Sequence, residues 1–381
     1  MHVAMSRDTV HDAGGDVVKI NDTTLRDGEQ APGVQFSEHS KIQIVERLLE
    51  LGVNEIEAGV SATLHRETQY LMYLQNCDMR HRFGVWSRAN LNDINQALNC
   101  KFGQIHISVP ISDFQLHHMG LDRKWVLTTV ERCIRHVYLY ADTISIGAQD
   151  ATRATKSFLL DFVALLNSYN VKRLRFSDTV GISVPSSIAK MTAFLRRCFN
   201  GDIDFHGHND LGLATANCVA AVENGVTEVS TTVNGIGERA GNAALEQVAV
   251  AVEMGLGKKT GVNMSGIPAL CELVANASDR NIPVDSPVTG ENVFTHASGI
   301  HCHGQLKNDL MYQPFKAETV GRTSKMVLGK HSGSASVCAA LSEKGINISR
   351  MTARTLLSTA HDRSLSINTQ NILQLLDSSN N

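Results

Sequence analysis

The sequence of 381 residues lacks the marks of several large classes of protein. Its 35 lysines and arginines are balanced by 38 acidic residues, so no basic excess indicates nucleic-acid binding. No apolar run reaches the roughly 18 residues that a membrane-spanning helix needs, and residues 1–16 lack the layout of a signal peptide. These absences predict a cytoplasmic protein with no nucleic acid or membrane among its partners, and residues 1–16 as a flexible leader.

A C-x-x-C pair is also absent. The eight cysteines are scattered along the chain, as Cys77, Cys100, Cys133, Cys198, Cys218, Cys271, Cys302 and Cys338. In a chain of this size without a secretion signal, scattered cysteines are predicted to be reduced thiols. Cys302 stands beside two histidines, which leaves open a role as a nucleophile or as a metal ligand.

Short β-rich segments alternate with helical patterns along most of the chain. The predicted strands cover residues 17–22, 53–59, 82–88, 104–110, 142–148, 173–179, 203–208 and 228–235. This alternation predicts an α/β fold, a (β/α)8 TIM barrel over residues 17–257, with its active site at the carboxyl ends of the strands. An open doubly wound sheet is less favoured because no G-x-G-x-x-G motif follows the first strand. A smaller, mainly helical region is expected over residues 258–381.

Two helices are predicted with particular detail. Ser37 is the expected N-cap of the first, and Gly52 the expected stop. Its core-facing positions are predicted to be Ile42, Val45, Leu48 and Leu49. The second helix is expected within residues 243–255.

Two histidines with one residue between them end the seventh predicted strand. Side chains alternate along a strand, so His206 and His208 are expected on one side. Asp27 follows the first strand and Asn242 the eighth, which places an oxygen ligand from each at the same rim. Mixed oxygen and nitrogen ligands suit a divalent ion such as Mg²⁺, Mn²⁺, Zn²⁺ or Co²⁺. The alternative is a solvated pair of histidines near an aspartate that caps a turn.

The segment after the eighth strand is rich in glycine. Gly235, Gly237 and Gly241 could cradle a phosphate, as the last loops of barrels often do. Alternatively they form a tight turn, with Glu238 and Arg239 paired across it.

Several long motifs resemble one family of metal-dependent acyltransferases, which make 2-isopropylmalate, citramalate and homocitrate. The motifs are "DTTLRDGEQAPG", "SDTVG", "HGHNDLGLATAN", "GIGERAGN", "FTHASGIH" and "LGKHSG", spread over residues 17–340. Within the family, "IHISVPISD", "IGAQDATRA", "RLRFSDTVG" and "PALCELVANA" are most similar to the homocitrate synthases of nitrogen fixation. The regulatory domain of the leucine-making relatives is not expected here.

The resemblance implies a Claisen-type condensation of acetyl-CoA with a 2-oxo acid, 2-oxoglutarate in the homocitrate case. A divalent metal ion chelated by the oxo acid would polarise the carbonyl carbon. Asp27, His206 and His208 match the family's metal ligands, and Asn242 matches a further, weaker ligand. Arg26 is expected to neutralise the alkoxide that develops on the ketone oxygen, an electrostatic role of the oxyanion-hole kind.

Four further residues are candidates at this site. Thr179 matches a position whose hydroxyl binds the substrate carboxylate, and Gln30 lies at the same rim. Arg153 could bind a carboxylate through two bonds, or could form a surface salt bridge after the fifth strand. Glu57 could orient a catalytic group or serve only in a structural ion pair.

The second region supplies the remaining catalytic candidates. His301 matches the family's catalytic histidine and Tyr312 a tyrosine that works near it. In the family this region reaches the active site of a partner subunit, so the resemblance implies a homodimer. From spacing alone, His296, His301 and His303 could instead form a separate metal site.

The sequence departs from the family at one position. Gln149 stands where relatives usually carry a glutamate that supports the catalytic histidine and tyrosine. Glutamine keeps the hydrogen bonding of glutamate but cannot carry its charge. Other functions remain open: synthases acting on 2-oxoisovalerate or pyruvate, aldol cleavage as in related lyases, and a non-catalytic metal-binding barrel.

Overall fold

The computed structural model describes residues 17–140, 144–305, 307–342 and 344–379, and the predicted leader lies outside them. The described chain forms two compact units. The first holds residues 17–263 and Ala269–Asn281, and the second Met264–Pro268 and the residues from Ile282 onward. No helix among the described residues is long and apolar enough to span a membrane.

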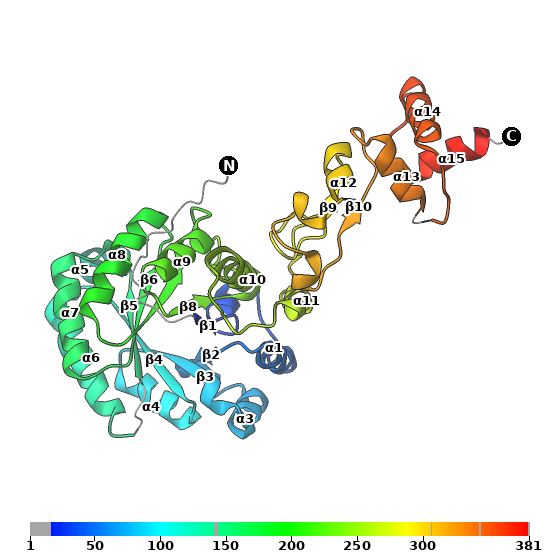
Figure 1. The fold of residues 1–381 in the computed structure, drawn as a ribbon. Helices are drawn as coiled ribbons and strands as arrows, with labels where there is room; N and C mark the ends of the chain where they lie inside the picture. The colour runs from blue at the N-terminus through cyan, green and yellow to red at the C-terminus, as the bar shows by residue number, and fades with distance from the viewer. Residues whose placement is uncertain (1–16, 141–143, 306, 343, 380–381) are drawn as a thin grey trace. The chain divides into compact units, whose positions relative to one another are not determined.

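The first unit is a closed parallel barrel (Figure 1), as the alternating pattern predicted. Its strands are β1 Lys19–Asp22, β2 Glu55–Val60, β3 Phe83–Arg88, β4 Gln104–Pro110, β5 Ile144–Gln149, β6 Arg173–Asp178, β7 Asp202–Gly207 and β8 Glu228–Thr231. The first and last strands close the barrel, in a register that pairs Lys19 with Glu228. The eighth strand is shorter than predicted because Val233–Gly235 forms a 3-10 turn, in which Asn234 takes a left-handed conformation (φ +58°).

Helices surround the barrel on its outside (Figure 1). They are α1 Glu38–Glu50, α2 Ser61–Leu64, α3 Thr68–Asn76, α4 Leu91–Cys100, α5 Asp113–His118, α6 Arg123–Val137, α7 Lys156–Ser168, α8 Pro185–Cys198, α9 Ala214–Glu223 and α10 Leu245–Val250. The predicted helix over residues 243–255 is present as α10 and a following π-helical turn, Ala251–Gly255.

The ends of α1 follow the sequence closely. The Ser37 hydroxyl accepts a hydrogen bond from the backbone N–H of Ser40, as an N-cap does. The helix ends at Glu50, and Gly52 then turns the chain with a positive φ of +84°.

The buried face of α1 differs from the prediction. Val45 and Leu48 are buried as expected, but Ile42 and Leu49 are only half-buried. Ile44 and Lys41 occupy the face that packs inward. The predicted inward face was therefore wrong in part. It did not include Lys41, because a lysine is buried only when partners from elsewhere in the chain neutralise its charge.

The barrel interior is unusually polar, and this positions the site. Inward side chains alternate along β6, so Arg173, Arg175 and Ser177 all point into the barrel. The two arginines bind carboxylates from β2, β7 and β8. Apolar residues of the strands alternate with these positions and pack beneath the helices.

The barrel unit extends beyond the predicted boundary at residue 257. The backbone N–H of Asn263 donates to the carbonyl of Leu51, and the side chain of Asn234 donates to the carbonyl of Cys271. These bonds hold residues 258–263, and most of α11 (Ile267–Ser278), to the first unit.

The second unit is mainly helical, as predicted. It contains a short parallel pair of strands, β9 Thr295–His296 and β10 Lys325–Met326, and the helices α12 Gly299–Gln305, α13 Ser334–Ser342, α14 Arg350–Asp362 and α15 Thr369–Ser379. A separate apolar core joins the last three helices, through residues that include Val337, Leu341, Ala353, Leu356 and Ile372.

Candidate metal centre and active-site cavity

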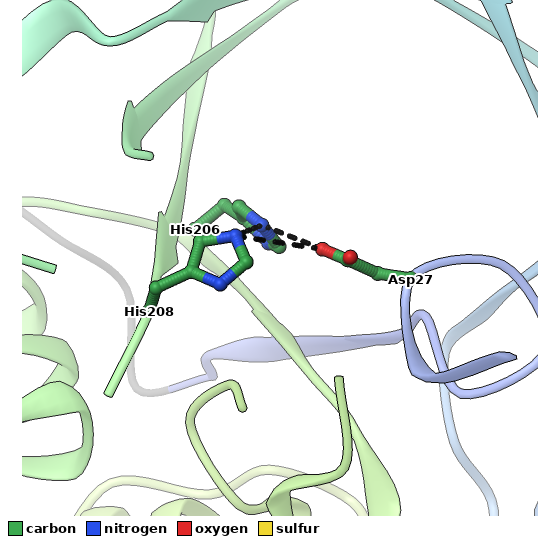
Figure 2. A group of neighbouring side chains, drawn as sticks. All are labelled: Asp27, His206 and His208. Carbon is green, nitrogen blue, oxygen red and sulfur yellow. Dashed lines mark hydrogen bonds and ion pairs between the residues drawn. The ribbon is translucent and has the colours of Figure 1, made fainter. Parts of the chain in front are cut away.

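Three ligating side chains converge at the carboxyl end of the barrel (Figure 2). Asp27 Oδ2 lies 3.0 Å from Nε2 of His206 and 3.7 Å from Nε2 of His208. The two imidazole Nε2 atoms are 3.3 Å apart. All three residues are buried. Two nitrogens and a carboxylate oxygen therefore face one point.

The local backbone explains why the two histidines meet. Gly207 separates them, and a side chain there would lie 2.9 Å from the ring of Phe205. The backbone N–H of His208 donates to the carbonyl of Asp178, and His208 forms an isolated β-bridge with Asn242. The strand pairing thus continues just far enough to hold both rings.

The charge state of the cluster suits a cation. Burial alone would raise the pKa of Asp27, but the Arg26 guanidinium and His206 hold it well below its usual range. Burial lowers the pKa of His208 to about 4, helped by neighbouring His206. At neutral pH the cluster therefore offers a carboxylate and a neutral His208 imidazole, which are the forms that bind metals.

Asn242 adds a fourth candidate ligand. Its Nδ2 donates to the carbonyl of Ile236, while its buried Oδ1 has no partner. A side chain at Gly237 would collide with this amide, so the glycine makes room for it. An orphaned buried oxygen beside the cluster fits a divalent ion, because such atoms otherwise cost free energy.

The glycines of this loop form a tight turn. The N–H of Gly235 donates to Thr232 and that of Gly241 to Glu238, so both donors are used within the turn. The predicted Glu238–Arg239 pair is replaced by another. The Arg239 guanidinium binds Asp210 at 2.8 Å instead, and Arg239 takes a left-handed conformation (φ +57°).

A cavity of about 220 Å³ opens beside the cluster. It is lined by Arg26, Asp27, Gln30, Trp86, His106, Ser108, Gln149, Arg175, Ser177, Thr179, His206, His208, Glu238 and Arg239. Half of these residues were candidates from the sequence. The other half were missed, although alternation along β4 and β6 places His106, Ser108, Arg175 and Ser177 on inward positions.

Arg26 is held rigidly at the cavity wall. Its Nε donates to Glu57 Oε2 at 2.6 Å, and its Nη1 lies 3.3 Å from Asp27 Oδ2. Glu57 is fully buried within β2 and does not line the cavity. Burial would raise the pKa of Glu57, but Arg175 and Arg26 hold it below its usual range. Glu57 therefore acts on Arg26 as an ionised partner.

The other candidates of the barrel divide into two groups. Gln30 donates to Asp27 Oδ1 at 3.2 Å, and both Gln149 and Thr179 line the cavity. Arg153 does not line it: both Nε and Nη2 bind the buried carboxylate of Asp150, at 2.7–3.0 Å. The structure thus favours the salt-bridge alternative for Arg153.

In the second unit, His301 and Tyr312 lie together. Their rings stack with centroids 4.3 Å apart and planes inclined by 29°. His296 is instead a hydrogen-bonding centre, because Gln305 and Gln313 both approach its Nε2, at 3.0 and 3.1 Å.

The other candidates of this segment show no reactive arrangement. The buried Cys302 thiol donates to the carbonyl of His296, and all eight cysteines are free, as predicted. The side chain of His303 lies outside the described residues. Among the described side chains, Asp27, His206 and His208 form the one group of three or more His, Cys, Asp or Glu ligands.

A closed (β/α)8 barrel with a candidate metal cluster at the carboxyl ends of its strands has the layout of barrel enzymes, whose active sites lie at that end. The HMGL-like family matches residues 17–274, and a family described as "Homocitrate synthase post-HMGL domain-like" matches residues 288–364. Among solved structures, an HMG-CoA lyase from Brucella melitensis has a TM-score of 0.62 at 18% identity, covering 70% of this chain and 100% of that one. At 18% sequence identity, this structural likeness shows that the two proteins share a fold.

Curated relatives are much more similar in sequence. A homocitrate synthase of Frankia alni is 41% identical, over 86% of this chain and 94% of its own. Homocitrate synthase 1 of a Nostoc species is 36% identical, over 94% and 97%. A 2-isopropylmalate synthase of Caldanaerobacter subterraneus is also 36% identical, over 92% and 91%. The chain therefore belongs to the HMGL-like family, in its branch of condensing acyltransferases that includes homocitrate and 2-isopropylmalate synthases.

Proposed function

We propose that this protein is a homocitrate synthase that condenses acetyl-CoA with 2-oxoglutarate and water. A carbon–carbon bond forms between the acetyl methyl carbon and C2 of the oxo acid. Water then cleaves the thioester, which releases homocitrate and CoA. One observation carries the proposal: the Asp27, His206 and His208 cluster opens into a cavity that Arg26 also lines.

Asp27, His206 and His208 would hold a divalent ion, with Asn242 Oδ1 as a further ligand. When bound, such an ion supplies Lewis-acid polarisation of the keto group. Arg26 stabilises the negative charge that develops on the keto oxygen, since its guanidinium is fixed in advance by Glu57. Gln30 and Thr179 position the substrate carboxylate beside these groups.

The proton transfers are assigned to His301 and Tyr312. One of them removes a proton from the acetyl methyl group, and their stacked rings would keep the pair in a fixed mutual orientation. The family resemblance supports a homodimer in which each subunit lends this pair to its partner. Gln149 belongs to the same machinery at a position where relatives carry a charged residue.

The choice of 2-oxoglutarate is supported by the relatives named homocitrate synthase and by the motifs shared with the nitrogen-fixation enzymes. We extend the proposal to a supply of homocitrate for the nitrogenase iron–molybdenum cofactor, in the cytoplasm. A relative named 2-isopropylmalate synthase is nearly as similar, so 2-oxoisovalerate is the competing substrate.

The test is thiol release from acetyl-CoA by purified protein, measured with 2-oxoglutarate, 2-oxoisovalerate or pyruvate. The protein is first stripped of metal with a chelator and then reloaded with Mg²⁺, Mn²⁺, Co²⁺ or Zn²⁺. We expect release that needs both a divalent ion and 2-oxoglutarate. A preference for 2-oxoisovalerate or pyruvate would overturn the substrate, and metal binding without turnover would overturn the reaction.

A further inference from the structure

Arg175 is a buried arginine with one uncommitted nitrogen. It is 2% exposed and points inward from the middle of β6. Its Nε donates to Asp204 and its Nη1 to Glu57, each at 2.5 Å. Its Nη2 is buried and has no hydrogen-bond partner.

Arg173 lies two residues earlier on the same face. Its contacts show that the barrel interior does not by itself leave a nitrogen of a buried arginine without a partner. Arg173 uses all three nitrogens, with Nε on Ser145, Nη1 on Glu228 and Nη2 on Glu55. A guanidinium is always charged and carries five N–H donors. Buried donors without partners are rare because they cost free energy. The partner of Arg175 Nη2 is therefore to be sought outside the protein chain.

Arg175 lines the active-site cavity, below the level of the metal cluster. The register pairs Ser177 with His206 and Arg175 with Asp204. One inward layer along a strand is roughly 6–7 Å, so Arg175 lies about that far beneath His206 along the strand direction. An oxo acid bound by its keto-acid end at the level of His206 would extend its other end toward Arg175.

The cavity wall around Arg175 consists of small or hydrogen-bonding groups. Gly147 on β5 is the register partner of Arg175, and its missing side chain makes room for the ring of His106, whose Nε2 would lie 2.5 Å from a Cβ there. The short hydroxyl side chains of Ser108 and Ser177 also line the cavity. Small hydrogen-bonding groups around an uncommitted guanidinium nitrogen suit a carboxylate better than an alkyl group.

We propose that Arg175 is the specificity-determining residue of the cavity, and that its Nη2 binds the distal carboxylate of a dicarboxylic 2-oxo acid. The inference rests on the proposed function and deepens it. Asp204 and Glu57 hold the guanidinium in place, and Nη2 provides the remaining donors. This role replaces the one that the sequence suggested for Arg153, which is bound to Asp150.

The test compares 2-oxoglutarate with 2-oxopentanoate, which has the same chain length but a methyl group in place of the distal carboxylate. The quantity measured is the ratio of kcat/KM for the two acids. Arg175→Lys keeps the charge but loses the planar fork, so this ratio should fall about 10- to 100-fold, as expected for hydrogen bonds to a charged group. The fall should come mainly from KM for 2-oxoglutarate.

Arg173→Lys is the matched control, because it is the same substitution two residues away, at an arginine that does not line this cavity. It should leave the ratio unchanged. Asp204→Asn weakens the bond that holds the Arg175 guanidinium, so it should lower the ratio by a smaller factor. If Arg175→Lys does not fold, the ratio measured for Asp204→Asn is the test of the inference. A folded Arg175→Lys that keeps the ratio within twofold overturns the inference, as does an equal fall in Arg173→Lys.

The two proposals fail in different ways. If wild-type protein prefers a monocarboxylic oxo acid, the substrate of the proposed function is wrong and this inference falls with it. If wild-type protein prefers 2-oxoglutarate and the variants keep that preference, only the role of Arg175 is wrong. If wild-type protein shows no turnover, the same ratio is taken from dissociation constants measured by calorimetry with the Mn²⁺-loaded protein, and the same thresholds apply.

Discussion

The two ends of the barrel interior use the same kinds of residue for different purposes. At the amino end, Arg173 and Lys19 are matched by Glu55, Glu228 and Asp202, so that each charge has an ionic partner. At the carboxyl end, polar atoms of Arg175 and Asn242 remain without partners, and Asp27 faces two imidazoles.

A cavity lies at each end, so the presence of space does not distinguish them. At the amino end, the side chain of Asn21 also lacks partners, but it is a neutral group among charges that are already paired. The carboxyl end differs from the amino end because it holds charged and ligating groups whose bonding capacity is not fully used within the chain. Buried charge alone therefore indicates structure, and buried charge left incompletely paired indicates a ligand.

The largest effect should come from breaking the carboxyl-end cluster. His208→Ala removes one of the two imidazoles proposed to hold the metal ion, and we expect thiol release to fall at least about a thousandfold, since ligands of a metal that drives the chemistry act as one unit. The melting temperature should change little, because rim residues do not build the barrel core. Activity and bound metal, measured by elemental analysis, check this.

His117→Ala is the control, because it removes an exposed histidine on α5 that is outside the cavity. It should keep metal and activity. A His208→Ala protein that loses its fold while its folded fraction retains full activity would show that the histidine pair is structural.

The second prediction addresses the amino end. Glu228→Gln leaves Arg173 with Glu55 as its remaining carboxylate, and the weakened buried network should lower the free energy of unfolding by about 1–3 kcal/mol. Urea denaturation measures this loss. The folded variant should keep the wild-type kcat and metal content. A loss below about 1 kcal/mol would mean that the amino-end network contributes less than its burial implies.

The third prediction concerns Gln149, at the carboxyl end of β5. A carboxylate there would stabilise the imidazolium form of His301, the proposed catalytic histidine, and make it a stronger base. Gln149→Glu should therefore raise the rate constant of thiol release by about tenfold, a part of the roughly 10²–10⁴-fold that general acid–base catalysis contributes. Single-turnover kinetics measure the rate constant, and metal titration should show an unchanged affinity.

Gln104→Glu makes the same substitution at the amino end of β4 and should not raise the rate. If Gln149→Glu leaves the rate flat or lowers it, proton transfer runs through other groups.

The smallest effect is a pH dependence of stability. Burial raises the pKa of Glu246 from its usual 4.5 to about 7. Between these two values the folded protein keeps a proton that the unfolded chain has lost, so the free energy of unfolding falls as pH rises. In Glu246→Gln, the decrease in the free energy of unfolding between pH 5 and pH 8 should be about 1–2 kcal/mol smaller than in the wild-type protein. Urea denaturation at several pH values checks this, and an unchanged slope would contradict it.

Much of the fold could be predicted because its signals are local. Strand-forming segments and the Ser37 cap depend on neighbouring residues, and all eight strands were found within a few residues of their ends. Lys41 could not be placed, because its burial depends on ion pairs to Glu29 and Glu67 on other segments. Such pairing becomes visible only when the chain has folded.

The residues of the site show the same difference between local and long-range signals. Asp27, His206 and His208 were found because two histidines stand close together in the sequence and their strand ends share a rim. Arg175 was missed because an arginine in a strand has no local sign of its role, which depends on one nitrogen left over by Asp204 and Glu57.

The long-range ion pairs of β6 also constrain how the chain can be divided. Arg173 binds Glu55 and Arg175 binds Glu57, and in each case the two residues are 118 positions apart in the sequence. A fragment ending after β4 would hold both glutamates in a core with neither arginine, and in the complementary fragment each arginine would keep only one of its two carboxylates, Glu228 or Asp204. Unpaired buried charges are strongly unfavourable. The two halves of this barrel should therefore be unable to fold as independent units, and should gain and lose their structure together.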